Sequence, residues 1–151
     1  MIGRSILKRF GRNEPPRRIG VFVSHSKDEA IAKQICTGID DAGAESFLDE
    51  LKVEAGDVFE QRLLDGLRRC EEHVILLSPR SVTRPYVWME LGASWIMGRR
   101  IVGIMNGITI RELRAMDGMP ALIADLNLID IGDVKSFFEE LRRRAGHDAK
   151  Q

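Results

Sequence analysis

The sequence alternates between two apolar patterns from residue 19 onward. Short, almost continuously apolar runs rich in β-branched residues stand at "IGVFVS" (19–24), "HVILLS" (73–78) and "RIVGIMN" (100–106). Runs of this length and composition are typical of strands that are buried on both faces of a sheet. Between them, apolar residues recur at helical spacing, as Ile31, Ile35 and Ile39 do. Strands that alternate with helices in this way predict a parallel sheet covered by helices on both faces.

Further elements complete this alternation. Two shorter strands are predicted at 44–49 and 126–131, and helices are predicted at 27–43, 58–72, 83–95 and 134–146. A charged loop (50–57) contains Gly56, and a looser segment runs through Pro120. For five strands in such units we predict a flavodoxin-like three-layer sandwich, a five-stranded parallel sheet with helices on both faces. Ligands of such folds bind beyond the carboxyl ends of the strands, so we expect a site in the loops after the first three strands.

The composition is that of one globular domain. A chain of 151 residues, 44% apolar and 30% charged, can bury one core but has little room for two. The net charge is zero, yet residues 1–18 carry six Lys or Arg and one acid, so the rest of the chain has a net charge of −5. A mildly acidic body argues against a nucleic-acid-binding surface. Cys36 and Cys70 lie far apart in helical patterns, and we interpret them as reduced core thiols rather than a disulfide.

Residues 1–18 form a basic segment with a pattern of its own. The apolar residues that fall at helical spacing in it are Ile2, Ile6, Leu7 and Phe10. One interpretation is a basic amphipathic helix that meets an anionic membrane or a partner. We favour a solvated leader that ends at Pro15-Pro16, because so short a helix is marginal alone. The segment lacks the features of a secretory signal, and no apolar run is long enough to span a bilayer, so we expect a cytoplasmic protein.

The loops after the strands exclude several chemistries found on this fold class. A response-regulator receiver needs an acidic cluster after the first strand and a phosphate-accepting Asp after the third. Here the first strand ends in Ser24-His25-Ser26 and the third in Ser78-Pro79. The sequence has no glycine-rich phosphate-binding motif of the P-loop or Rossmann kind and no Gly-x-Ser-x-Gly nucleophile elbow. The three histidines show no metal-ligand spacing with one another or with cysteine, so we predict no metal site.

Three stretches in these loops together resemble the TIR (Toll/interleukin-1 receptor) domain family. "VFVSHSKDE" resembles the family's first box, an apolar strand that ends in Ser plus an aromatic residue or His. "FLDELKVEAGDVFEQRL" is similar to the second strand, the BB loop (the charged loop 50–57) and the start of the next helix, in the form found in TIR domains that hydrolyse NAD. "LLSPRSVTRPYVWMELGASW" resembles the third box. The resemblance covers a TIR domain at residues 19–145, which leaves the basic leader (1–18) and a tail (146–151) outside it.

The resemblance implies that Glu90 is the catalytic glutamate of a TIR NAD hydrolase. The helical pattern agrees on the geometry, since Tyr86 and Glu90 are four residues apart and share one face of the helix. Val87, Leu91 and Trp95 share another face, which can pack on the sheet. From the helix alone, Glu90 could instead be a solvated residue at the edge of a core helix. The family's tryptophan is Tyr86 here, so an aromatic ring is kept at that position.

The resemblance also implies nucleotide contacts from residues just after the first strand and from the acid of the BB loop. In this sequence those residues are Ser26, Lys27 and Glu54, and Tyr86 would line the same substrate site. Lys27 can meet a phosphate as a point charge. A solvated first-turn lysine and a solvated loop charge are the alternatives for Lys27 and Glu54. We interpret Asp49, at the end of the second strand, as an anchor of the loop, and a nucleotide contact is its alternative.

The implied reaction suits a single carboxylate. Breaking the bond between nicotinamide and ribose creates an oxocarbenium-like centre, which one carboxylate aimed at the ribose can stabilise. Nicotinamide leaves as a neutral molecule, so no second acid is required. The resemblance thus implies an NAD+ glycohydrolase, with NAD+ as substrate and no cofactor. Its products would be nicotinamide plus ADP-ribose or a cyclic ADP-ribose-type signal, which in a bacterium would fit antiphage defence.

Partners follow from the same resemblance. Enzymatic TIR domains resemble one another in working as assemblies, which implies self-association through TIR–TIR contacts and a separate effector or activator protein. The rival function is a non-catalytic TIR adaptor that only binds other TIR domains. A virulence factor that mimics host TIR domains and an N-glycosidase for another nucleotide are further alternatives. Glu90 favours the enzyme, because an adaptor has no chemical need for an acid at that position.

Overall fold

The computed structural model describes residues 18–26, 28–48, 59–118 and 126–148, which form a five-stranded parallel sheet with helices on both faces. The strands are β1 (Gly20–Ser24), β2 (Glu45–Leu48), β3 (Glu72–Leu77), β4 (Arg100–Met105) and β5 (Asn127–Asp130). The helices are α1 (Glu29–Asp41), α2 (Phe59–Arg69), α3 (Pro85–Ile96), α4 (Ile110–Ala115) and α5 (Val134–Asp148), with 3₁₀ turns η1 (Ser81–Thr83) and η3 (Ile131–Asp133). The strand order, β2-β1-β3-β4-β5, confirms the flavodoxin-like prediction.

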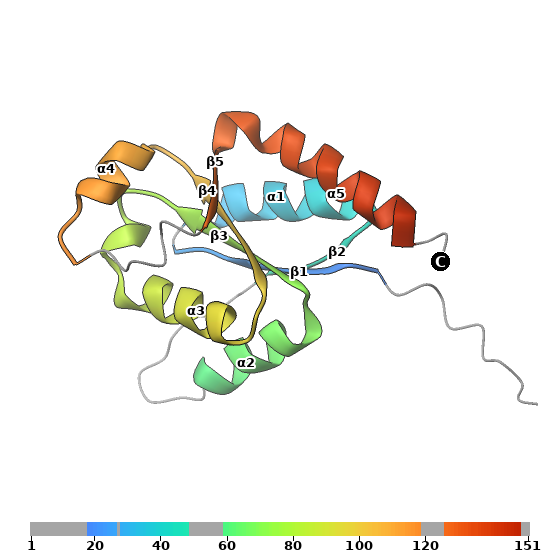
Figure 1. Cartoon of the computed structure of the whole chain (residues 1–151), viewed down its shortest axis with the longest axis horizontal. Coiled ribbons are helices and arrows are strands. Elements are labelled where there is room, and N and C mark those ends of the chain that lie inside the picture. Colours follow the sequence, from blue (N-terminus) through green and yellow to red (C-terminus); the bar gives the residue numbers. More distant parts are fainter. Residues whose placement is uncertain (1–17, 27, 49–58, 119–125, 149–151) are drawn as a thin grey trace, which may run out of the picture.

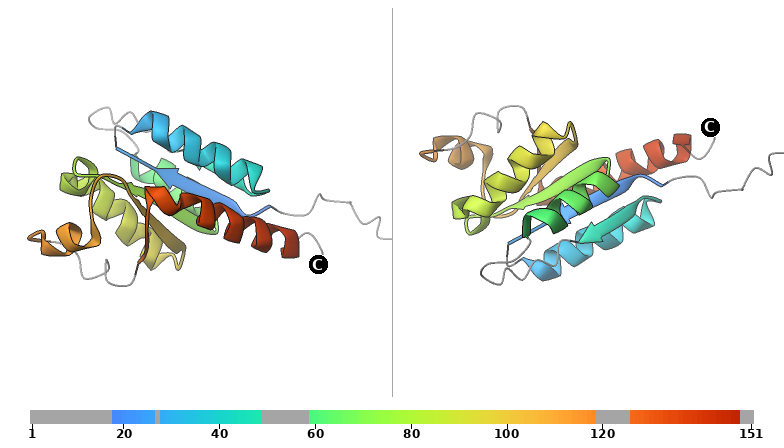
Figure 2. Two further views of the ribbon diagram at one scale, coloured as in Figure 1. Left: turned by 90° about the horizontal axis from the view of Figure 1, so that it is seen from above. Right: turned by 90° about the horizontal axis from the view of Figure 1, so that it is seen from below.

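The helices form one layer on each face of the sheet. Helices α1 and α5 lie on one face, and α2 and α3 lie on the other (Figure 1). The two further views separate these layers, with α1 and α5 nearest the viewer in one and α2 and α3 in the other (Figure 2). Strands β1 and β3 are adjacent in the sheet, with β2 outside β1 and β4 outside β3. The direction in which successive strands are added to the sheet therefore reverses between β1 and β3. The carboxyl ends of β1 and β3 therefore form the switch point at which such folds bind ligands.

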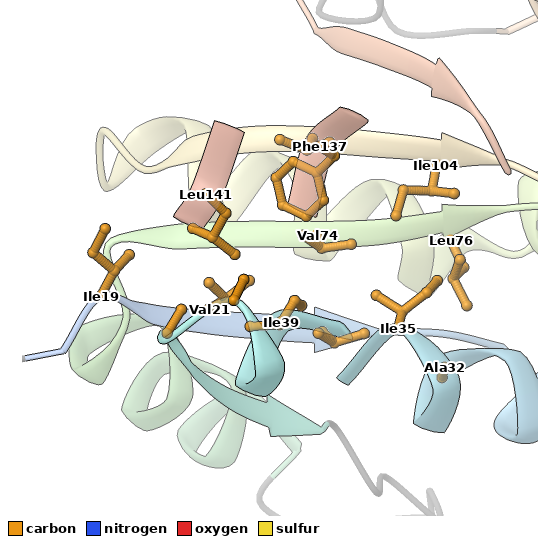
Figure 3. Close-up of a cluster of buried hydrophobic side chains, with 14 residues drawn as sticks. Ile19, Val21, Ala32, Ile35, Ile39, Val74, Leu76, Ile104, Phe137 and Leu141 are labelled. Carbon is orange, nitrogen blue, oxygen red and sulfur yellow. The ribbon is translucent and has the colours of Figure 1, made fainter. Parts of the chain in front are cut away.

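The alternation of side chains along the strands divides the core between the two layers. Val21, Val74 and Leu76 point toward α1 and α5, where they pack with Ile39 and Leu141 (Figure 3). The side chains that alternate with these along β1 and β3 point the other way, toward α2 and α3. On that face Phe22 packs with α2, and Ile75 and Leu77 pack with α3. Because side chains alternate with a period of two, each apolar strand contributes to both cores.

Helix α4 is one element that periodicity does not predict, since it falls in the segment expected to be loose. Its start is fixed by a capping box, in which Glu112 N donates to Thr109 Oγ1 (3.1 Å) and Thr109 N donates to Glu112 Oε2 (2.9 Å). A helix of six residues is too short for an apolar repeat, so only its cap marks it in the sequence.

Two other features bear on the predictions. Cys36 and Cys70 are both free, in agreement with their interpretation as thiols. None of the helices within the described ranges is long and apolar enough to cross a membrane.

Candidate functional site

The carboxyl end of β1 carries polar groups with hydrogen-bonding capacity to spare. Ser24 is fully buried, and His25 and Ser26 are half-buried as the chain passes toward α1. His25 Nδ1, Ser26 Oγ and Asp28 Oδ2 are buried atoms that make no hydrogen bond with any described residue. Buried polar atoms of a folded protein are normally paired, so these three can pair with a ligand or with water. Burial lowers the pKa of His25, against the raising effect of Glu29, which favours the neutral ring.

A serine-rich turn at the end of β3 fixes the start of α3. Ser78 N donates to Ser81 Oγ (2.8 Å), Ser81 N donates to Ser78 Oγ (3.2 Å), and Ser81 Oγ donates to Leu76 O (3.1 Å). Pro85 then occupies the first turn of α3, where its missing N–H costs nothing. Trp88 Nε1 donates to Val82 O (3.0 Å) and ties this turn to the helix. The Ser-Pro-x-Ser pattern of the sequence (78–81) therefore has a structural role, which is to aim α3.

Helix α3 buries one stripe of residues, and Glu90 belongs to it. The buried residues of this helix are Val87, Glu90, Leu91 and Ser94. Glu90 is only 7% exposed, so its interpretation as a solvated surface residue is wrong. Tyr86, one turn earlier, is 45% exposed at the outer edge of the same side. The buried carboxylate and the exposed aromatic ring are thus neighbours on the helix, as the four-residue spacing predicts.

The predicted packing of Trp95 on the sheet is wrong, because this side chain is 56% exposed. Successive residues of an α-helix are about 100° apart. Trp95, eight residues after Val87, has therefore turned by about 80° from it, whereas Ser94, seven residues after Val87, lies within about 20° of it. Ser94 takes the inner position and is fully buried. Val87 and Leu91 pack toward the sheet as predicted.

Glu90 faces the β1 side of α3. Ala93 and Met97, which follow Glu90 by three and seven residues on the same side of the helix, pack against the cluster formed by Phe22 and the α2 residues Leu63 and Leu67. That cluster, which includes Cys70 beside Gly20, lies under the middle and the amino end of β1. Glu90 lies nearer the carboxyl edge, because α3 runs against the strands from the end of β3 to the start of β4. Glu90 is therefore turned toward the switch point between β1 and β3, the same place at which His25 and Ser26 leave β1.

Two predicted site residues, Lys27 and Glu54, lie outside the described part of the chain, and so do Asp49 and Gly56. Of the remaining predicted site residues, Ser26 follows β1, and Tyr86 and Glu90 lie on the first half of α3. Within the described ranges, no group of three or more His, Cys, Asp or Glu side chains could hold a metal ion.

A buried hydrogen-bonded chain lies directly beneath the site, and motif analysis of the sequence did not single it out. His73 Nε2 is 2.7 Å from Ser24 Oγ, and His73 Nδ1 is 2.5 Å from Ser94 Oγ. All three residues are fully buried. The sequence signals that could have found them are a histidine at the start of an apolar strand and a serine seven residues after Val87, on the inner stripe of α3.

His73 is expected to make the stability of the fold depend on pH. Burial lowers the pKa of His73 from 6.5 to about 3. Below about pH 6.5 the unfolded chain takes up a proton that the folded protein does not, so the free energy of unfolding falls by about 1.4 kcal/mol per pH unit as the pH drops. Urea unfolding between about pH 7 and pH 5 should show this slope, and His73→Gln should reduce it. The lowered pKa of His25 leaves a residual slope of the same sign, whereas identical slopes in both proteins would contradict the prediction.

Comparison with known proteins identifies the family to which the chain belongs. The TIR domain family model matches residues 21–144, and the chain belongs to this family. A plant relative, described as "Probable 2' cyclic ADP-D-ribose synthase BdTIR" from Brachypodium distachyon, is 26% identical over 128 residues. The match covers 83% of this chain but only 55% of the relative, so the chain spans about half of that protein's length.

Solved structures agree on the fold and differ in what they do. The TIR domain of the Toll-related receptor TRR-2 from Hydra magnipapillata superimposes with a TM-score of 0.58 at 14% identity, covering 87% of this chain and 98% of that one. The Clostridium botulinum CMP N-glycosidase BcmB superimposes with a TM-score of 0.53 at 15% identity, covering 81% and 97%. A receptor domain and a glycosidase thus share this fold, so the function has to be argued from the site.

Proposed function

We propose that this chain is an NAD+ glycohydrolase of the TIR family, which cleaves the bond between nicotinamide and ribose. The observation that carries the proposal is the buried carboxylate of Glu90, turned toward the switch point where His25 and Ser26 present polar atoms available to a ligand. The description of the plant relative as a cyclic ADP-D-ribose synthase supports the same bond cleavage, since that product lacks nicotinamide. NAD+ is then the substrate, and the reaction needs no cofactor.

The proposed role of Glu90 is electrostatic. As the bond to nicotinamide breaks, positive charge develops on the ribose, and a carboxylate already fixed beside it stabilises that charge without reorganisation. Burial strengthens the effect, because less water screens the interaction in a protein interior than at its surface. Nicotinamide leaves as a neutral molecule, so no general acid has to be found among the neighbouring residues.

Binding of the nucleotide is proposed to involve four residues around this carboxylate. Ser26, with its buried hydroxyl, would hydrogen-bond the nucleotide, and Lys27, next in the chain, would meet a phosphate. Tyr86 would offer its half-exposed ring to one of the bases by stacking. Glu54 would contact the nucleotide from the BB loop.

We further propose that the enzyme acts in the cytoplasm as an assembly held by TIR–TIR contacts, with a separate effector or activator protein. The product would be ADP-ribose or a cyclic ADP-ribose-type signal. In a bacterial cell such a reaction would serve antiphage defence, either by depleting NAD+ or by supplying the signal to that effector.

A non-catalytic TIR adaptor is the second candidate, and one observation favours it. Helix α3 carries four of the large apolar side chains that are most exposed in the described part of the chain, namely Tyr86, Met89, Trp95 and Ile96. Ile96 is 79% exposed. An exposed apolar face of this kind suits contacts between TIR domains. An assembled enzyme would also need such a face, so the surface alone does not decide between the two.

The experiment that tests the proposal is release of nicotinamide from millimolar NAD+ by the purified full chain, at high protein concentration and with a crowding agent. We expect nicotinamide to appear together with ADP-ribose or a cyclic product in the same chromatogram. CMP, NADP+ and nicotinamide mononucleotide serve as parallel substrates. Release of a base from CMP but not from NAD+ would replace the proposal by an N-glycosidase of other specificity. No release from any of these substrates would favour the adaptor.

A further inference from the structure

A buried polar chain joins three elements that meet beneath the proposed active site. Ser24 ends β1, His73 is the second residue of β3, and Ser94 lies in the second half of α3. The ring of His73 connects the two hydroxyls through its two nitrogens, at 2.7 Å and 2.5 Å. The ring of Phe22 packs against it, with centroids 5.4 Å apart. The imidazole is therefore held by a hydrogen bond at each of its two nitrogens and by the packing of Phe22 against the ring.

The two hydrogen bonds of His73 are interdependent. Burial lowers the pKa of His73 to about 3, so the ring is neutral at physiological pH. A neutral imidazole has one nitrogen that donates and one that accepts. If one serine accepts a hydrogen bond from the ring, the other must donate one to it. The hydrogen bonds from Ser94 through His73 to Ser24 therefore run in one direction. The orientation of the Ser94 hydroxyl determines the orientation of the Ser24 hydroxyl.

The dimensions of helix and strand place Glu90 level with Ser24. Helix α3 returns from the carboxyl end of β3 to the start of the parallel strand β4, so it runs against the strands. Glu90 lies one turn before Ser94, which is about 6 Å nearer the carboxyl edge of the sheet. Ser24 is in register with Ile75, two residues beyond His73 and so about 6.6 Å nearer the same edge. Along the strand direction, His73 and Ser94 therefore lie at one level, and Ser24 and Glu90 lie together at a second level nearer the carboxyl edge of the sheet.

The apolar contacts of α3 with the sheet cannot fix this alignment as sharply. Val87 and Leu91 pack on Ile75, Leu77 and Ile101, which are apolar contacts without direction. Such contacts tolerate a small slide or rotation of the helix. Hydrogen bonds depend steeply on distance and angle, so the bond between His73 and Ser94 penalises the same movement.

We propose that His73 is a positioning residue, which with Ser24 and Ser94 sets the height and rotation of α3 so that Glu90 faces the polar end of β1. The inference rests on the proposed function, because it states what holds the proposed catalytic carboxylate in place. His73 does not touch the reacting atoms. It acts through Ser94 on the helix and through Ser24 on the loop that carries His25 and Ser26.

The test compares three changes to the chain. His73→Phe keeps a ring of similar size but leaves two buried hydroxyls without a partner. The triple variant Ser24→Ala, His73→Phe, Ser94→Ala removes those hydroxyls too, which should restore much of the lost stability. His73→Gln keeps one donor and one acceptor on a neutral side chain. The control is Leu141→Ala, which opens a cavity in the core on the opposite face of the sheet.

The steady-state rates of nicotinamide release separate positioning from stability. A misplacement of about 1 Å can lower kcat as much as a hundredfold, so we expect both His73→Phe and the triple variant to lose about 10- to 100-fold in kcat, with KM for NAD+ changed by less than about threefold. His73→Gln should recover part of the loss. Leu141→Ala should keep the wild-type kcat wherever it is folded. A triple variant that regains both stability and kcat would overturn the proposal, because stability would then explain the whole effect.

A second readout does not depend on catalysis. The ¹³C chemical shift of the Glu90 carboxylate, assigned through Glu90→Gln, should move in His73→Phe and in the triple variant but not in Leu141→Ala. An unmoved signal in the triple variant would overturn the positioning role. If the wild-type protein releases no nicotinamide, the proposed function fails, and the carboxylate signal still decides whether His73 positions Glu90.

Discussion

Glu90→Gln is expected to lower kcat for nicotinamide release by at least about a hundredfold, and about a thousandfold where the chemical step is rate-limiting. The amide has the size and shape of the carboxylate, so the inner stripe of α3 can stay packed. It lacks the negative charge that is proposed to stabilise the oxocarbenium-like ribose. Because this interaction strengthens in the transition state, kcat should fall with little change in KM for NAD+.

The matched control for this variant is Glu139→Gln, the same chemical change on the exposed surface of α5. It should retain wild-type activity. Circular dichroism and urea unfolding show whether each variant is folded at the assay temperature. If Glu90→Gln and the wild type release nicotinamide at equal rates, Glu90 has no part in the reaction, and the catalytic group is another residue. Activity lost in the variant but present in the control identifies the enzyme and its catalytic residue together.

The fold could be predicted from the sequence because its strands are unusually apolar. The three central strands are found within about one residue of the predicted runs, for example 73–78 predicted and Glu72–Leu77 found. A run buried on both faces has no alternation, so the sequence does not say which side chains enter which layer. That assignment, with Val74 toward α1 and Ile75 toward α3, is made only when the strands are in register.

The site could be predicted only in part, because the sequence locates Glu90 on a helix but does not define how that helix is rotated on the sheet. The motif around Glu90 fixes its position on a helix, and helical spacing correctly pairs it with Tyr86. The rotation of that helix is less well defined, because a repeat of four residues drifts by about 40° at each step. This drift carries Trp95 out to solvent and brings Ser94 inside. The contact between Ser94 and His73 joins residues 21 apart in sequence and depends on how α3 lies on the sheet. No local pattern contains that information.

Arg144→Met is expected to lower the free energy of unfolding by about 2–3 kcal/mol. Glu72 opens β3 at the amino edge of the sheet, and its side chain is only 2% exposed. Arg144 of α5 binds it with both guanidinium Nη atoms, at 2.6 Å and 3.1 Å. Removing the arginine leaves a buried carboxylate without its bidentate partner, which costs more than the pair contributes. Arg100, whose Nε is 3.6 Å from Glu72 and whose side chain is 40% exposed, can compensate only in part.

A double-mutant cycle measured by urea unfolding tests this account. Glu72→Met combined with Arg144→Met should recover most of the stability lost in Arg144→Met, because an apolar pair of similar volume needs no charge compensation. Arg143→Met, at the exposed neighbouring position on α5, is the control and should stay within about 0.5 kcal/mol of the wild type. An Arg144→Met protein as stable as this control would contradict the prediction and would mean that Arg100 alone neutralises Glu72. Since the pair lies at the amino edge and the proposed site at the carboxyl edge, the double variant should unfold like the wild type and keep its rate of nicotinamide release.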